Sequence, residues 1–351
     1  MNKGSCMHTI SICIIAFNAH QYITRCLESI RSQTLLPHEI IFIDDCSSDS
    51  TYQDAKKYEK ILPQLKVFKL KKNSGVGKSR NIAISKATGD YIWAIDCDDT
   101  IPFNAIEIFT KYIKKYNSEV IIGAENILSQ TGHLQTIFTP TDEYFNITPI
   151  EHPELSIFTS GFHHSMCIRR NFLLNSHIKY GENLVASADG VFLFSLLPKI
   201  SKCTLIKDII YNYYMNENSV SRVRTKKFYQ DDFYAWSILT TQYNERAELK
   251  YSADRSLYRI EEFINIDIYD IQKLDKKDKI YVIKKLLTTF KRKNLCRLML
   301  YNQIKKEKFT VPIKTVFLLL LNLSSLTLLN ILIYILIKKD KFPFHHKHST
   351  K

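Results

Sequence analysis

Cysteine, glycine and proline are all sparse in this sequence of 351 residues, which has eight cysteines, nine glycines and nine prolines. No two cysteines form a C-x-x-C pair, and their spacing matches neither a zinc site nor the disulfide framework of a small secreted protein. We therefore expect reduced thiols that mostly pack in the interior. The low glycine and proline content also excludes a collagenous or low-complexity protein.

Acidic residues are outnumbered, because 35 Asp and Glu stand against 49 Lys and Arg, and the formal charge is +14. Such a surplus suits an anionic partner, which could be nucleic acid, an anionic membrane or a phosphorylated small molecule. The sequence has no basic–aromatic interleaving and no recognised nucleic-acid module, so nucleic acid is not the expected partner. Hydrophobic residues make up 45% of the chain, enough for a real core, and the length predicts about two domains.

No apolar signal core follows Met1, so we do not expect export and predict a cytoplasmic protein. A different apolar segment, residues 316–337, carries no charged residue and is long enough to cross a bilayer core of about 30 Å. Polar residues interrupt this segment, and lysines flank both of its ends. A buried terminal helix and a membrane attachment both explain it, and we favour attachment to the cytosolic face of the membrane, peripherally or by a C-terminal anchor.

The first hundred residues alternate between apolar runs typical of buried strands and stretches with helical periodicity. Continuous apolar strands separated by helices indicate a mostly parallel sheet covered on both faces, so we predict an α/β fold. The expected strands are 10–16, 39–43, 66–70 and 91–95, and the expected helices are 22–30, 51–60 and 78–86. Shorter strands and loops are expected over 118–214, and helices over 225–308.

Polar or aromatic residues follow the end of each predicted strand. They are Phe17-Asn18, Asp44-Asp45, Asn73-Ser74-Gly75 and Asp96-Cys97-Asp98-Asp99. In open α/β sheets ligands bind at the carboxyl edge of the strands, so we expect these four segments to converge on one crevice.

The last of these segments crowds three carboxylates, Asp96, Asp98 and Asp99, into one turn. Like charges this close repel one another unless a proton or a cation intervenes. Carboxylates combined with substrate phosphates commonly hold Mg²⁺ or Mn²⁺. A solvated acidic turn explains the cluster equally well when it is taken in isolation.

Residues 75–79 (Gly-Val-Gly-Lys-Ser) look like the end of a phosphate-binding P-loop. That pattern requires a glycine five residues before its Gly-Lys-Ser, and Lys72 stands there. The segment also follows the third predicted strand and does not open the fold. A nucleoside triphosphatase is therefore disfavoured, and so is a dinucleotide cofactor, because no G-x-G-x-x-G follows the first strand.

Five motifs in order carry a resemblance to a known family. They are Ser-Ile-Cys-Ile-Ile-Ala-Phe-Asn at 11–18, Glu-Ile-Ile-Phe-Ile-Asp-Asp-Cys-Ser-Ser-Asp-Ser-Thr at 39–51, Asn-Ser-Gly at 73–75, Ser-Arg-Asn at 79–81 with Ala-Thr-Gly-Asp-Tyr-Ile at 87–92, and Asp-Cys-Asp-Asp at 96–99. Residues 9 to about 125 thus resemble the nucleotide-sugar-binding half of family 2 glycosyltransferases. The resemblance implies a GT-A fold, which is a Rossmann-like nucleotide-diphospho-sugar transferase fold, followed here by a C-terminal helical region.

The resemblance also implies roles for individual residues. Phe17 would stack on the uracil of a UDP-sugar, Asp45 would accept from the ring N–H, and Arg80 would help to fix the nucleotide. Asp96 would contact ribose or sugar, and Asp98 would ligate Mn²⁺ or Mg²⁺ with Asp96 or Asp99 in support. The metal would neutralise the departing diphosphate. Further residues expected around the donor are Ala16, Asn18, Asn73, Gly75 and Cys97.

The family inverts the anomeric centre and needs a carboxylate as general base on the acceptor hydroxyl. Ser187-Ala188-Asp189 falls where the family has its Glu-Asp dyad, so the resemblance implies Asp189 as the base, although Ala188 replaces the usual Glu. Glu182 is the alternative base. In the competing structural interpretation, Asp189 caps a helix over 190–197.

Residues 211–222 resemble the closing segment of the family, whose flexible loop often covers the diphosphate. Arg222 and Arg224 could supply charge-assisted bonds to that group. The Gln-x-x-Arg-Trp motif of processive synthases is missing, which predicts transfer of one sugar per encounter. Residues 225–351 have no match.

The resulting hypothesis is a GT-A domain over 1–224, a helical region over 225–310 and an apolar, basic-flanked membrane-associating tail over 311–351. The enzyme would be an inverting, metal-dependent glycosyltransferase that moves a single hexose or N-acetylhexosamine from a UDP-sugar to a glycan or lipid-linked acceptor. The pathway would be surface polysaccharide or lipooligosaccharide biosynthesis. The alternative is a membrane-associated relative that binds nucleotide-sugar without turnover, which Ala188 motivates. The oligomeric state is left open.

Overall fold

The computed structural model describes residues 8–149, 152, 163–216, 227–228, 230–231 and 234–235. Its first hundred residues alternate strands and helices as the sequence predicts. The strands are β1 (Ile10–Ala16), β2 (Glu39–Asp44), β3 (Leu65–Lys69) and β4 (Tyr91–Asp96), and the helices between them are α1 (His20–Arg31), α2 (Thr51–Tyr58) and α3 (Val76–Lys86). These four strands are parallel to one another in the order β3-β2-β1-β4.

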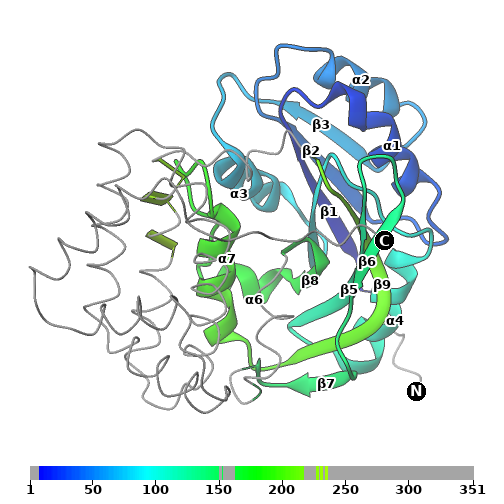
Figure 1. The fold of residues 1–351 in the computed structure, drawn as a ribbon, viewed down its shortest axis with the longest axis vertical. Helices are drawn as coiled ribbons and strands as arrows, with labels where there is room; N and C mark the ends of the chain where they lie inside the picture. Colours follow the sequence, from blue (N-terminus) through cyan, green and yellow to red (C-terminus); the bar gives the residue numbers. More distant parts are fainter. Residues whose placement is uncertain are drawn as a thin grey trace, which may run out of the picture. The chain divides into compact units, whose positions relative to one another are not determined.

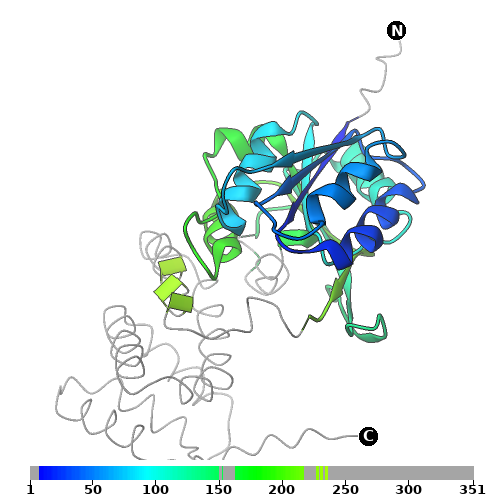
Figure 2. The same ribbon diagram turned by 90° about the horizontal axis from the view of Figure 1, so that it is seen from above.

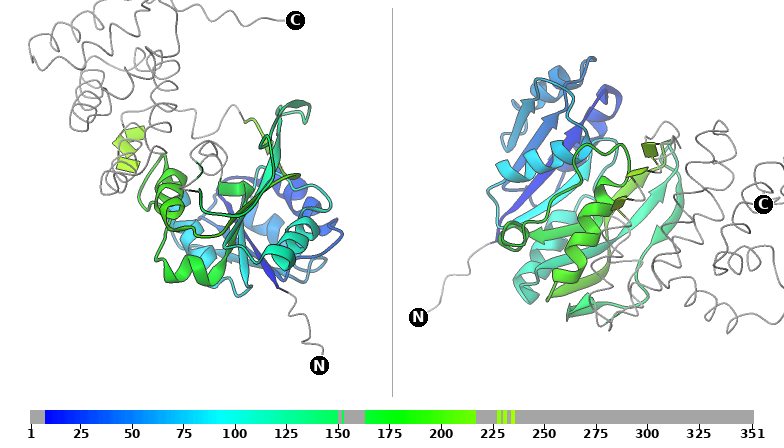
Figure 3. Two further views of the ribbon diagram at one scale, coloured as in Figure 1. Left: turned by 90° about the horizontal axis from the view of Figure 1, so that it is seen from below. Right: turned by 90° about the vertical axis from the view of Figure 1, so that its left-hand side faces the viewer.

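The rest of the sheet is built from later segments, with antiparallel as well as parallel pairs. The later elements are α4 (Ala105–Tyr116), β5 (Val120–Leu128), β6 (Leu134–Phe138), β7 (Tyr144–Ile147), β8 (Met166–Arg169), α6 (Arg170–Asn175), α7 (Ala188–Leu196) and β9 (Cys203–Tyr214), with single 3-10 turns at His163–Ser165 and Leu197–Lys199. Within the described residues the sheet continues as β4-β8-β5-β9-β7, and β6 pairs with β5. The β5–β6 hairpin projects from the body of the sheet (Figures 2 and 3).

Helices cover both faces of the parallel strands (Figure 1). On one face, α1, α2 and α4 pack on alternate strand residues such as Ile12 and Ile14. On the other face, α3, α6 and α7 pack on residues such as Cys13. Side chains alternate between the faces along a strand, so an all-apolar strand needs cover on both sides. The predicted α/β class is confirmed.

The parallel register brings the ends of three strands to one edge. Ala16 pairs with Asp44, and Ile15 pairs with Asp96, so β1, β2 and β4 finish side by side. The residues that follow these strands are therefore neighbours although they lie up to about eighty positions apart in the sequence. This is the edge at which the sequence predicts the crevice.

The described residues fall into two compact units. The first holds residues 8–216 together with Tyr234 and Ala235, and the second holds Lys227, Phe228, Gln230 and Asp231, in which Lys227 forms an ion pair with Asp231. Among the residues described, no helix is long and apolar enough to span a bilayer. The predicted boundaries at 224 and 310 and the apolar segment 316–337 lie outside the described residues.

Six of the cysteines lie in the described part of the chain, and all six are free thiols there. Five of them are buried: Cys13, Cys26, Cys97, Cys167 and Cys203. The expectation of unpaired packing residues is confirmed for these positions.

Glu39 opens β2 and joins the parallel strands through one buried carboxylate. It accepts hydrogen bonds from Ser11 Oγ on β1 (2.9 Å), from Thr88 N and Oγ1 ahead of β4 (2.6 and 2.7 Å), and from Lys66 Nζ on β3 (2.8 Å). Burial opposes the charge, but these partners lower the pKa of Glu39 to about 2. The ionised form is therefore part of the folded structure.

Glu39→Gln is expected to lower the free energy of unfolding by about 2–3 kcal/mol at pH 7. The folded-state pKa lies below that of an unfolded glutamate, about 4.3, so the stabilisation is complete above that value and disappears as the pH falls toward 2. Urea unfolding followed by tryptophan fluorescence should thus show a large difference from wild type at pH 7 and about half of that difference at pH 3. Asp142→Asn, at an exposed position, is the control, and an equal loss at both pH values would contradict the prediction.

Candidate active site

Asp45 follows β2 and is buried against the loop that precedes α3. Its carboxylate accepts the backbone N–H groups of Ser74 (2.7 Å) and Gly75 (2.8 Å). Gly75 has φ 83°, in the left-handed region that favours glycine. These amides of the P-loop-like segment are thus directed at a side chain of the protein itself. The arrangement agrees with the sequence argument against a P-loop.

Phe17 and Asn18 form the turn that follows β1. Asn18 has φ 48°; its backbone N–H donates to Ser47 Oγ (2.9 Å) and its Oδ1 accepts from Ser48 N (3.0 Å). The N–H of Asp45 donates to the carbonyl of Ala16 (2.8 Å), so this turn lies beside that of β2. The Phe17 side chain is left 51% exposed. An exposed aromatic ring beside a buried carboxylate is suited to a flat heteroaromatic base.

Arg80 on α3 and Asp96 at the end of β4 form a close ion pair, with Nη2 and Oδ1 2.5 Å apart. Arg80 is buried, and its guanidinium lies over the Tyr180 ring at 5.2 Å. Burial acts to raise the pKa of Asp96, but the positive charge of Arg80 outweighs it and the pKa lies well below the usual range. Asp96 is thus a carboxylate, and its side chain is 26% exposed.

The acidic turn places its side chains in different surroundings. Asp99 is buried and accepts from Tyr211 OH and Tyr214 N, both at 2.7 Å. The backbone carbonyl of Asp98 accepts from Arg25, while burial and the charge of Asp96 raise the pKa of the Asp98 carboxyl. The repulsion expected from the sequence is therefore present, and a cation beside Asp98 would relieve it.

Cys97 is directed away from this crevice. Its side chain is 4% exposed and lies in the core against Cys26, where that contact and burial raise the pKa of the thiol. Successive side chains of an extended segment point to opposite sides, so Cys97 turns inward while Asp96 turns outward. A contribution of Cys97 to donor binding would have to come from its backbone.

Asp189 lies in the first turn of α7, which begins at Ala188 and not at the predicted position 190. Its Oδ1 accepts from the N–H of Gly190 (2.9 Å). The negative charge of Asp189 acts on Arg80 and on His163, and it helps to raise the pKa of the Arg80 guanidinium. The start of α7 is therefore part of the same charged cluster as Asp96.

Ala188, which stands in place of the family's usual Glu, has a packing reason to be small. It is 3% exposed, and its Cβ would lie 3.3 Å from a Cβ added at Gly77. The same added atom would lie 1.9 Å from the carbonyl oxygen of Gly181. The starts of α3 and α7 and the loop at Gly181 are thus packed in direct contact, and this contact holds the first turn of α7 close to α3, which carries Arg80.

Glu182, the alternative base, lies in the loop that precedes α7. It is exposed, and its Oε1 accepts from Asn81 Nδ2 at 3.1 Å. Asn81 also exchanges hydrogen bonds with the backbone of Tyr180. Glu182 therefore helps to fix this loop to α3, while Asp189 lies closer to the charged cluster.

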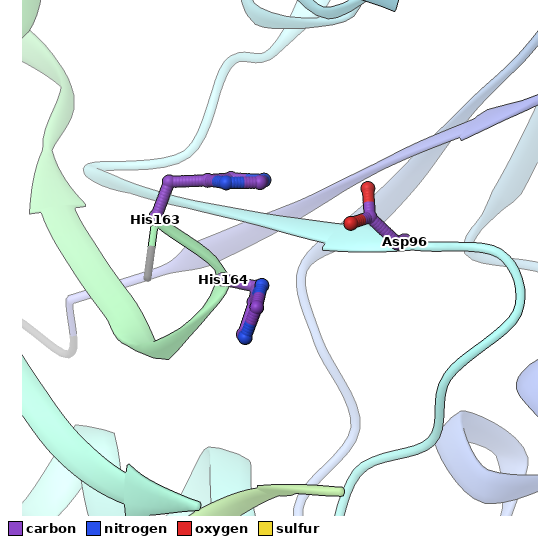
Figure 4. Close-up of side chains that lie close together, drawn as sticks. All are labelled: Asp96, His163 and His164. Carbon is purple, nitrogen blue, oxygen red and sulfur yellow. The ribbon is translucent and has the colours of Figure 1, made fainter. Parts of the chain in front are cut away.

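Two adjacent histidines lie beside Asp96, and they were not among the residues predicted from the sequence (Figure 4). His163 and His164 form the short turn before β8, and both are buried. Burial, followed by the charge of Arg80, lowers the pKa of His163 to about 3, so its imidazole is neutral. The charge of Glu125 outweighs burial at His164 and raises its pKa.

The amino-acid sequence was also compared with known proteins. Residues 11–174 match the sequence model of the family described as "Glycosyl transferase family 2". This stretch of the chain belongs to glycosyl transferase family 2.

The chain is also similar to two bacterial transferases that act on poly(ribitol-phosphate). The chain is 26% identical over 235 residues to the poly(ribitol-phosphate) beta-N-acetylglucosaminyltransferase TarS of Staphylococcus aureus, covering 65% of this chain and 39% of that protein. It is 28% identical over 227 residues to the poly(ribitol-phosphate) beta-glucosyltransferase of Bacillus spizizenii, covering 63% and 35%. The chain thus spans about two fifths or less of these relatives' length.

A solved structure supports the fold. The crystal structure of S. aureus TarS 1–349 in complex with UDP-GlcNAc matches with a TM-score of 0.64 at 21% identity, covering 83% of this chain and 84% of that chain. At this level of identity the likeness concerns the fold. The predicted GT-A fold is confirmed.

The predicted donor residues of the family 2 segment form two linked groups in the structure. One joins Ala16, Phe17, Asn18, Asp45 and Gly75, and the other joins Arg80, Asp96 and Asp189. Asn73 adds a bond from its Oδ1 to the N–H of Gly75 (3.2 Å). Arg222 and Arg224 lie outside the described residues. The two histidines offered a weak signal, since a His-His pair before a predicted strand has no distinctive spacing.

Proposed function

We propose that the protein is an inverting, metal-dependent glycosyltransferase that moves one hexose or N-acetylhexosamine from a UDP-sugar to a hydroxyl of a glycan or glycolipid acceptor. Membership of family 2 supports glycosyl transfer, the structure of TarS in complex with UDP-GlcNAc supports a UDP-sugar donor, and the two poly(ribitol-phosphate) transferases support a polymer acceptor. The observation that carries the proposal is the shared edge at which Asp45, Asp96 and the start of α7 meet.

The uridine half of the donor suits the Phe17–Asp45 group. The exposed Phe17 ring offers a stacking face, and the Asp45 carboxylate keeps acceptor capacity beyond its two backbone bonds. A uracil ring N–H is a donor of the matching kind. Arg80, already fixed by Asp96, would contribute positive charge near the diphosphate.

The acidic turn suits a divalent cation. Asp98 carries a carboxyl whose charged form is disfavoured by burial and by Asp96, so a nearby cation would be stabilising there. Oxygen ligands of this kind match Mn²⁺ or Mg²⁺. When bound, the ion would offset the charge of the departing diphosphate. Asp98 would be its main protein ligand, with support from Asp96.

Asp189 would remove the proton from the acceptor hydroxyl as general base. It lies in the first turn of α7, where the helix N-terminus favours negative charge. Packing of Ala188 near Gly77 fixes where this turn lies relative to α3 and thus to Arg80. The acceptor hydroxyl would bind between Asp189 and the donor sugar.

The proposed acceptor and the proposed location of the enzyme both follow from its positive net charge. The excess of +14 suits an anionic polymer or an anionic membrane. We place the enzyme at the cytosolic face of the membrane, with residues 225–310 as a helical region and residues 311–351 as a membrane-associating tail.

Thermal unfolding with nucleotides tests the proposal. UDP with Mn²⁺ at about 100 times its Kd should stabilise the protein by about 2.7 kcal/mol, which corresponds to a rise in Tm of roughly 5–10 °C for a domain of this size. GDP and dTDP with the same ion should give smaller shifts. Equal or absent shifts for all three would contradict a UDP-sugar donor. Hydrolysis of UDP-glucose, UDP-galactose and their N-acetylamino forms would then identify the sugar.

The second candidate is a relative that binds nucleotide-sugar without turnover. The buried Ala188 favours it, since one carboxylate of the expected dyad is lacking. This candidate predicts the same UDP-dependent rise in Tm without transfer or donor hydrolysis. Turnover that depends on Asp189 would exclude it.

A further inference from the structure

The buried ring of His163 carries a polar atom that no group in the described part of the chain satisfies. The side chain is 4% exposed, and Nε2 has no hydrogen-bond partner among the described residues. A buried nitrogen of this kind costs free energy unless something else binds it. Its ring contacts are with His164 and Tyr180, edge to face.

His163, His164 and Asp96 bring three potential metal ligands together. One ligand atom from each residue lies within 4.8 Å of the other two. Figure 4 shows both rings on the turn before β8, on the side of the Asp96 carboxylate. Ligands on one tetrahedral ion stand roughly 3.4 Å apart, given metal–ligand distances of about 2.0–2.2 Å. Movements of about 1 Å in these side chains would therefore bring the three ligand atoms to the spacing that one bound ion requires.

His164 is already oriented as metal-bound histidines are. Its Nε2 lies 2.8 Å from Oε2 of Glu125, a carboxylate on β5 that is fully buried. A carboxylate on the far nitrogen fixes the ring and raises its basicity as a ligand, and such partners are typical of protein metal sites.

We propose that Asp96, His163 and His164 form a cation site for a divalent ion that accepts nitrogen ligands, such as Zn²⁺ or Co²⁺. Two imidazoles and one carboxylate are a donor set typical of transition-metal ions. Asp96, which is 26% exposed, gives the site access to solvent.

Arg80 sets the selectivity of this site. Its guanidinium holds Oδ1 of Asp96, which leaves Oδ2 for an ion but adds a positive charge nearby. That charge works against Mg²⁺, whose binding depends on carboxylate charge. Ions that gain most of their binding energy from imidazole nitrogen are less affected. The site therefore differs in chemistry from the oxygen-rich turn at Asp98, with which it shares Asp96.

Cobalt titration of the chelator-treated full-length protein tests the site. Co²⁺ bound to imidazole nitrogen in a four-coordinate site gives a visible absorption band that hydrated Co²⁺ lacks. Wild type should develop this band, with saturation at one ion, and Zn²⁺ should abolish it while Mg²⁺ should not. His163→Gln is expected to weaken Co²⁺ binding by roughly tenfold or more, and Glu125→Gln by about 10–100-fold.

Two further variants make the result decisive. His133→Gln, at an exposed histidine away from the site, should leave the titration unchanged. Asp98→Asn should retain the Co²⁺ band even where it abolishes transfer, so the cation site and the proposed function can fail separately. The inference is overturned if His163→Gln, shown to be folded by its Tm, binds Co²⁺ like wild type, or if Asp98→Asn removes the band.

Discussion

Asparagine in place of Asp189 is expected to lower the rate of sugar transfer by about 10²–10⁴-fold, the range that a positioned general base contributes. The amide side chain would preserve the shape and the hydrogen bond from Gly190 but could not accept a proton. Because the groups that we propose to bind the nucleotide lie elsewhere, at the ends of β1 and β2 and on α3, the Kd for UDP should change by less than about threefold. Release of UDP gives the rate, and calorimetry gives the Kd.

The matched variant for this test is Glu182→Gln. Glu182 is exposed and bonded to Asn81, so its loss should loosen a loop and reduce the rate only slightly. If Glu182→Gln lost activity and Asp189→Asn retained it, the two assignments would have to be exchanged. If neither had an effect on a measurable turnover, the base would be a different residue.

The parallel half of the fold was predictable because each of its elements has a strong local signal. Strands such as Ile10–Ala16 are buried on both faces, so they appear in the sequence as nearly unbroken apolar runs. The antiparallel half has weaker signals. β6 is almost wholly exposed along its length, and β8 has only four residues, yet β8 lies between β4 and β5 in the sheet. Pairing between segments so far apart in sequence leaves no trace in local composition.

The convergence of Asp45 and Asp96 on one edge of the sheet was predictable for a related reason. Asp45 and Asp96 follow strands that the sequence identifies, and parallel strands end at one edge. The inward direction of the Cys97 side chain was not predictable, since membership of a motif does not tell which side chains turn toward the core. His163 and Glu125 were missed because they come from the antiparallel half, where their positions depend on the unpredicted pairing of β8 with β5.

Asp98→Asn is expected to have two opposite effects. The rate of transfer should fall by about 10³-fold, because the proposed metal ion would supply several kcal/mol of charge stabilisation to the departing diphosphate. The gain in Tm from Mn²⁺ with UDP should also disappear. The metal-free variant, however, should be at least as stable as wild type at pH 7, since the substitution removes one of three crowded, largely buried carboxylates.

This combination separates a functional role of Asp98 from a structural one. Replacing a residue that serves packing or hydrogen bonding would lower both stability and activity. Replacing a cation ligand instead removes charge repulsion that destabilises the metal-free protein and that the bound ion relieves. Tm should therefore be measured without metal, with Mn²⁺ and with Mn²⁺ plus UDP, for wild type, Asp98→Asn and the exposed control Asp142→Asn. If the metal-free Tm dropped markedly for Asp98→Asn but not for Asp142→Asn, the acidic turn would have a structural role. An undiminished response to Mn²⁺ with UDP would place the ion on other ligands.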